Sequence, residues 1–167
     1  MQSINKKYII IGAIVLLFLI SKKVKAETII AQFEGLRLKS YKDEGGIWTI
    51  GYGSTKDPFT GAKVVEGMAI SQEMALAWLK QDVKSRMDAI KKLIKVPVNN
   101  NQLAALTSLA YNIGLGAFQG STLLKLLNNK APIKQVADQF LRWNRVSGKV
   151  SQGLSNRRKL ERELFLR

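Results

Sequence analysis

The sequence predicts an α+β protein that is mainly α, with a small lobe built on a β-hairpin and a larger helical lobe. Residues 36–53 have the extended segments and turn residues of a short hairpin, which directly follows a helical segment. Residues 71–96 keep helical spacing over a run long enough to connect two lobes, and shorter capped helices follow. With 167 residues, 46% hydrophobic and 23% charged, the chain suits one globular domain with a substantial core.

A helix is predicted to end at Glu34, immediately before the hairpin. Apolar residues recur at helical spacing in ETIIAQFE, and Gly35 then supplies the residue that can take the left-handed C′ conformation. The hairpin is expected to bring Asp43, near its tip, and Thr49, on its second strand, toward one wall of a cleft. The helix end would offer Glu34 from another wall.

Glu34 and Asp43 are therefore expected to differ in environment, one half-buried and the other exposed to water. Glycoside hydrolysis uses such a difference, because one carboxyl must donate a proton to the leaving oxygen while an ionised carboxylate activates water or stabilises positive charge. On spacing alone, a glutamate at a helix end and an aspartate in a turn are more often ordinary solvated residues. Both interpretations stay open at this level.

Glu34, Asp43 and Thr49 stand in the order Glu, eight residues, Asp, five residues, Thr. This spacing resembles the signature of the phage-type lysozymes or endolysins, glycoside hydrolase family twenty-four. The flanking EGLRLKSYKD and TIGYG resemble the T-even branch, and AYNIGLGAFQGSTLLKLLN and GLSNRRKLERELFL resemble the lambdoid branch. The resemblance covers roughly residues 27–167. It implies a lysozyme-like fold and hydrolysis of the β-1,4 bond between N-acetylmuramic acid and N-acetylglucosamine in peptidoglycan.

The resemblance implies a catalytic role for each of the three signature residues. Glu34 would protonate the glycosidic oxygen, and Asp43, together with Thr49, would direct water at the sugar carbon. The simpler interpretation of Thr49 is a strand residue, since threonine favours pleated surfaces.

Four further residues match family positions near the substrate. Tyr111, Asn112 and Ser121 match positions that line the sugar cleft, and Arg157 matches an arginine that lies near the catalytic glutamate. As single residues, the first three would more often be packing and capping groups, and an arginine at a helix start could equally be solvated.

Residues 1–26 are predicted to be a separate export module, either a signal peptide or a signal-anchor, and residues 27–167 the lysozyme domain. The start is basic, residues 8–20 form an uninterrupted apolar run, and Ala26 ends a segment with small residues at the expected cleavage spacing. Lysines crowd that site, so cleavage and a retained anchor both stay open. The expected location is the periplasm or cell wall, with tethering to the inner membrane through residues 8–20 before release or cleavage.

The charge of the chain favours an anionic partner. There are 27 Lys and Arg against 12 Asp and Glu. Five of the basic residues lie in residues 1–26, so 22 basic against 12 acidic residues leave a net charge of +10 on residues 27–167. Nucleic acid, anionic lipid and an anionic cell wall would each suit such a surface.

The residue types present narrow these choices. The sequence has no cysteine and no histidine, which excludes disulfides and thiolate chemistry and makes a metal site unexpected. Neither an aromatic nucleic-acid platform nor a helix-turn-helix pattern is present. We therefore expect no metal, no cofactor and no nucleic-acid partner, with peptidoglycan as the substrate of a monomer.

Two rival functions are weighed against hydrolysis. A lytic transglycosylase would release anhydro-sugars without adding water, and keeping both Asp43 and Thr49 argues against it. A catalytically idle, basic wall-binding protein would suit the charge alone, and the intact signature disfavours it.

Capping residues delimit the predicted helices. Ser71 and Asn99 are expected to cap two long helices, Ser121 to cap a short one and Pro132 to open another. The last helix, from residue 155, is expected to carry a cationic outer face.

Overall fold

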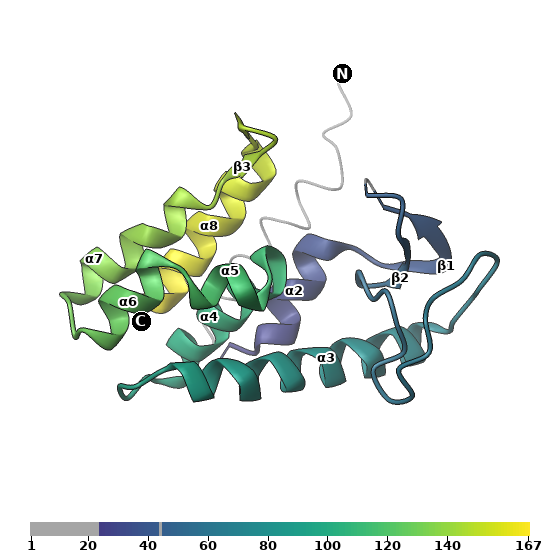
Figure 1. The fold of residues 1–167 in the computed structure, drawn as a ribbon, viewed down its shortest axis with the longest axis horizontal. Coiled ribbons are helices and arrows are strands. Elements are labelled where there is room, and N and C mark those ends of the chain that lie inside the picture. Colours follow the sequence, from purple (N-terminus) through teal and green to yellow (C-terminus); the bar gives the residue numbers. More distant parts are fainter. Residues whose placement is uncertain (1–23, 44) are drawn as a thin grey trace, which may run out of the picture.

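A computed structural model describes residues 24–43 and 45–167. The hairpin lobe and the helical lobe are joined by a long helix (Figure 1), which confirms the predicted mainly helical α+β fold. The apolar run at residues 8–20 lies outside the described residues. Within the described ranges, no helix is both long enough and apolar enough to cross a membrane.

The hairpin directly follows the first described helix, as predicted. Helix α2 (Ala26–Glu34) ends at Gly35, whose φ of 72° and ψ of 170° lie in a region that is essentially restricted to glycine. Strand β1 (Arg37–Lys42) pairs antiparallel with strand β2 (Trp48–Gly51), and Tyr41 lies opposite Thr49. The segment 52–71 is irregular and is held to the lobe by isolated bridges, such as Lys39 to Ala69.

Helix α3 (Gln72–Leu93) belongs to the cores of both lobes. The Ser71 hydroxyl accepts a hydrogen bond from the Met74 amide and caps the helix, as predicted. Ala75 and Trp78 pack with Ile50, Val64 and Ile70 in the core of the small lobe. Leu79, Val83 and Ile90, farther along the helix, join the core of the large lobe. The long helix therefore fixes the hairpin relative to the helical lobe.

Helix α4 (Asn100–Ile113) lies at the centre of the large lobe, and every residue from 104 to 110 is buried. It packs against α2, α3 and the last helix, α8 (Gln152–Phe165). The elements between them are α5 (Leu115–Gln119), α6 (Thr122–Asn128), α7 (Ile133–Asp138), a 3-10 helix η1 (Gln139–Arg142), and a hairpin of β3 (Arg145–Val146) and β4 (Lys149–Val150).

Some sequence-based expectations for the large lobe are wrong. Pro132 precedes α7 as its N-cap instead of opening it, because its ψ of 132° is extended. The last helix is capped by Ser151 and begins at Gln152, three residues earlier than expected. Its predicted cationic outer face is only partly correct, because Lys159 is exposed whereas Arg157 and Arg158 are both buried.

Candidate active site

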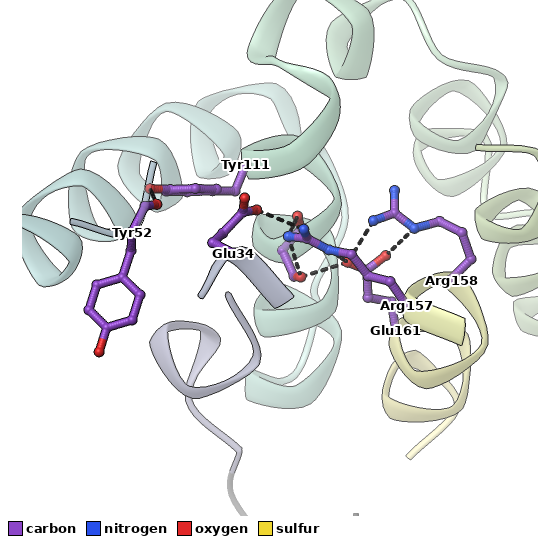
Figure 2. A network of polar contacts seen from close by, with 7 residues as sticks. Glu34, Tyr52, Tyr111, Arg157, Arg158 and Glu161 are labelled. Atoms are coloured by element: carbon purple, nitrogen blue, oxygen red, sulfur yellow. Dashed lines mark hydrogen bonds and ion pairs between the residues drawn. The ribbon is translucent and has the colours of Figure 1, made fainter. Parts of the chain in front are cut away.

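Glu34 is the last residue of α2, and its side chain faces Arg157 of α8 (Figure 2). Arg157 Nη1 donates a hydrogen bond to Glu34 Oε1 at 2.7 Å, joining residues that are 123 positions apart. The Glu34 side chain is 23% exposed, whereas that of Arg157 is 3% exposed. The guanidinium carbon also lies 5.3 Å from the centre of the Phe33 ring. Glu34 thus presents a partly accessible carboxyl that is held by a buried cation.

Behind this ion pair lies a buried polar network between α4 and α8. Glu161 Oε1 accepts hydrogen bonds from Ser108 Oγ at 2.6 Å, from Arg157 Nε at 3.1 Å and from Arg158 Nη2 at 3.1 Å. Its second oxygen lies 2.9 Å from Arg158 Nε. Burial lowers the pKa of Arg158 to about 10, and the Glu161 carboxylate opposes that shift. Sequence reasoning missed Glu161 and Arg158, although their spacing of three residues on a helix places them on one face.

Asp43 lies in the turn between β1 and β2, where its backbone N–H donates to the carbonyl of Ile47. Asp43 Oδ1 accepts hydrogen bonds from the amides of Gly45 and Ile47, each at 2.9 Å. Within the described part of the chain, no hydrogen bond occupies Oδ2. Asp43 is half-buried, as is Glu34, so the expected contrast in exposure is wrong. The two carboxyl groups differ in their partners instead: a guanidinium for Glu34, and backbone amides for Asp43.

Thr49 and Asp43 both donate a hydrogen bond to the carbonyl of Ile47. The Thr49 side chain is buried in β2, and its hydroxyl donates to the carbonyl of Ile47 at 3.1 Å. The same carbonyl accepts from the backbone of Asp43, and the Ile47 amide donates to the Asp43 carboxylate. Because the Thr49 proton is used in this way, the hydroxyl oxygen can offer a further partner only its lone pairs.

Tyr111 joins the two lobes. Its hydroxyl donates to the carbonyl of Tyr52 in the small lobe at 3.0 Å, and its ring lies beside Glu34 (Figure 2). The Arg86 guanidinium stacks over that ring at 4.7 Å. Burial raises the pKa of the Tyr111 hydroxyl, which therefore stays protonated and keeps its role as a donor. Neighbouring Asn112 is exposed to solvent.

Ser121 has both of its hydrogen-bonding roles filled within the large lobe. The hydroxyl donates to the carbonyl of Phe118 at 2.7 Å and accepts from the amide of Leu124 at 3.1 Å, which caps α6 as predicted. The side chain is buried. Its observed contacts are those of a capping residue, and its contact with sugar stays a prediction.

Asp82 of α3 takes part in a contact between the lobes. Ser54 Oγ, in the small lobe, donates to Asp82 Oδ2 at 3.1 Å. Asp82 is half-buried, and burial raises the pKa of its carboxyl, while the bond from Ser54 opposes that rise.

The arrangement of a hairpin lobe, a connecting helix, a helical lobe and a glutamate at the helix end defines the lysozyme-like class of fold. The phage lysozyme family model matches residues 31–161, and the chain belongs to this family. This agrees with the resemblance found in the sequence.

Curated relatives include endolysins of several phages. The chain is 45% identical to the endolysin of Bacillus phage B103 over 140 residues, which cover 83% of this chain and 51% of that protein. It is 47% identical to the endolysin of Salmonella phage P22, over 80% of this chain and 89% of that protein. The SAR-endolysin of Enterobacteria phage P21 is 37% identical, with coverage of 80% and 77%. The chain spans about half the length of the Bacillus phage endolysins that it matches.

Solved structures share the fold over most of the chain. The endolysin of Escherichia coli O157:H7 phage FAHEc1 superposes with a TM-score of 0.76 at 40% identity, covering 88% of this chain and 94% of that one. The muramidase domain of SpmX from Asticcacaulis excentricus superposes with a TM-score of 0.75 at 33% identity, covering 85% and 95%.

Proposed function

We propose that this protein is an endolysin that hydrolyses the β-1,4 bond between N-acetylmuramic acid and N-acetylglucosamine in peptidoglycan. The observation that carries the proposal is the placement of Glu34. Its carboxyl is partly exposed at the end of α2, it is held by Arg157, and the hairpin that carries Asp43 and Thr49 follows directly. Family membership and the muramidase domain among the structural neighbours support the same reaction.

In this mechanism Glu34 is the general acid. It donates its proton to the glycosidic oxygen as the bond to the sugar carbon breaks, so that the leaving sugar departs as an alcohol. The carboxyl must face the bond for this transfer, and the hydrogen bond from Arg157 limits the directions that it can take.

Asp43 and Thr49 would hold the water that attacks the sugar carbon. Asp43 Oδ1 is fixed by two backbone amides, which leaves Oδ2 to accept a proton from that water. The Thr49 oxygen would accept the second water hydrogen, because its own proton is donated to Ile47. Water held in this way attacks from the face opposite the leaving group, and the product has inverted configuration.

The partners follow from the substrate. Peptidoglycan carries peptide carboxylates, which suit a domain with a net charge of +10.

We further propose that residues 1–26 direct export and hold the protein at the inner membrane, and that Tyr111 and Asn112 lie along the sugar cleft. The basic start and the apolar run at residues 8–20, together with a relative named SAR-endolysin, support export.

Digestion of purified peptidoglycan, followed by mass spectrometry of the soluble fragments, tests this function. We expect fragments that end in reducing N-acetylmuramic acid and carry one added water per cleaved bond. Proton NMR of the first-formed ends should show the α-anomer. Anhydro-sugar ends would instead indicate a lytic transglycosylase, and binding without release of fragments would indicate a wall-binding protein.

A further inference from the structure

Every nitrogen of the Arg157 side chain has a partner. Nη1 donates to Glu34, Nε donates to Glu161, and Nη2 donates to the carbonyl of Ser108 at 3.2 Å and contacts its hydroxyl at 3.4 Å. The guanidinium is planar and rigid, so bonds at Nε and Nη2 determine where Nη1 points. The position of the Arg157 guanidinium is therefore fixed by the two contacts that face away from Glu34, one to Ser108 of α4 and one to Glu161.

Glu161 also balances the charge of this region. It is fully buried and contacts two guanidinium groups, whose positive charges favour the ionised form of its carboxyl. Burial raises its pKa, and both arginines oppose that rise. The groups that face it are Arg157 and Arg158 from α8 and the Ser108 hydroxyl from α4, while Glu34 of α2 lies on the other side of Arg157.

Stability alone is a poor explanation for this network. Replacing a buried ion triad by apolar residues of similar volume often leaves a protein equally stable or makes it more stable, because removing the charges from water is costly. In the described residues, Arg158 Nη1 has no hydrogen-bond acceptor, which adds to that cost. Figure 2 shows this nitrogen directed away from Glu161.

We propose that Glu161 is a positioning residue for the reaction, acting on Glu34 through Arg157. Its Oε1 fixes the guanidinium so that Nη1 meets the Glu34 carboxyl, and its charge cancels one of the two buried arginines. This inference rests on the proposed function, because it assigns Glu161 a role in placing the general acid.

Two variants separate positioning from charge. Glu161→Gln keeps the shape but removes the carboxylate that balances one of the two buried guanidinium groups. The double variant Glu161→Gln with Arg158→Met removes one carboxylate and one guanidinium, which restores the original net charge while still weakening the hold on Arg157 Nε. On soluble peptidoglycan fragments, kcat should fall about 10- to 100-fold in both, since misplacing a catalytic group by ~1 Å costs about that much. KM should change little, because none of the substituted side chains lies at the surface.

The pH profile distinguishes the two variants from each other. In Glu161→Gln, the extra positive charge favours the ionised form of Glu34, so the alkaline limb of the kcat profile should move to lower pH. In the double variant the limb should stay near its wild-type position. If Glu161→Gln fails to fold, the double variant decides the matter, because its buried charge is balanced.

Asp138→Asn is the matched control. Asp138 pairs with Arg162 of α8 at 2.7 Å on the surface and takes no part in the network, so its loss should leave kcat and the pH profile unchanged. Wild-type kcat in the folded double variant would overturn the proposal, whatever the change in thermal stability. Glu34→Gln measured in the same assay keeps the two hypotheses apart: if it retains wild-type activity, the proposed role of Glu34 fails independently of Glu161.

Discussion

At the scale of single residues, Gly35 determines how the chain turns from the helix that carries Glu34 into the hairpin. Its φ of 72° with ψ of 170° is accessible essentially only to glycine. The sequence indicated a left-handed C′ glycine at this position, because a helical pattern stops there; the positive φ agrees with that prediction, but the ψ of 170° is extended.

Gly35→Ala should destabilise the protein by about 1–3 kcal/mol, the usual cost of a residue held in such a region. An added Cβ would meet no atom within 4 Å, so the cost would come from the backbone alone. Gly116→Ala is the control, since that residue lies in α5 with open space around it and no positive φ. Urea denaturation measures both, and equal stability of the two variants would contradict the strain at Gly35.

Asp82 allows a prediction of pH dependence. Burial raises the folded-state pKa of its carboxyl above the unfolded value of 3.8, so its contribution to stability is fully present below that value. The contribution is lost as the pH rises through the folded-state pKa. Asp82→Asn should therefore be more stable than the wild type at pH 7, and the difference should shrink as the pH falls toward 4.

Thermal unfolding at a series of pH values measures this difference. Asp88→Asn, which changes an exposed carboxylate on the same helix, should show little pH-dependent difference in stability from the wild type. A constant difference across the pH range would mean that the titration of Asp82 does not affect stability.

At the scale of elements, the ends of the helices were predictable because capping is local. Ser71, Asn99 and Ser121 each accept a hydrogen bond from an amide three residues ahead, as their positions before apolar periodic segments indicated. At Asn99 the structure also shows a contact that was not predicted: the Asn99 amide donates a hydrogen bond to the Gln102 side chain, which completes a capping box.

Asn99→Ala should cost about 1 kcal/mol of stability, the typical value of a lost N-cap. Asn100→Ala is the matched control, because Asn100 is exposed and lies inside the first turn of α4. Chemical denaturation would reveal the difference between the two variants. Equal denaturation midpoints for the two variants would mean that the capping box contributes nothing to the stability of the folded protein.

The elements and contacts that were missed depend on distant parts of the chain or on very short patterns. Arg158 looked like part of a solvated face, because nothing local to α8 shows that its side chain is buried. The family resemblance did place Arg157 near Glu34, 123 residues earlier, and the two side chains are hydrogen-bonded in the structure. The hairpin of β3 and β4 turns at Ser147 and Gly148, which both have positive φ. That Ser-Gly pair was its local signal, and strands as short as these give no periodicity.

At the scale of the whole molecule, the family resemblance identified the fold, while the geometry behind the signature needed three dimensions. The spacing of Glu34, Asp43 and Thr49 could be read directly, but the hydrogen bonds that Asp43 and Thr49 both donate to the Ile47 carbonyl could not. The resemblance also placed Ser121 at the sugar cleft, which stays a prediction, and it did not show that both hydrogen bonds of the Ser121 hydroxyl are made within the large lobe.

Residues 1–26 should direct export of the whole molecule, since a basic start precedes the apolar run at residues 8–20. Mass spectrometry of protein from the envelope fraction of expressing cells measures the outcome. A mature N-terminus at Glu27 would establish cleavage, and an intact Met1 would establish an anchor. Intact protein confined to the cytosol would contradict both.

The role of Glu34 is tested most directly by the rate at which Glu34→Gln lyses purified peptidoglycan. The amide keeps an oxygen for Arg157 but cannot donate the proton that the leaving sugar requires, so lysis should fall at least ~10²-fold, the lower range for general acid catalysis. Circular dichroism and thermal unfolding should show a folded protein, so that the loss reflects chemistry. Lysis by folded Glu34→Gln at close to the wild-type rate would contradict the assignment of Glu34 as the general acid.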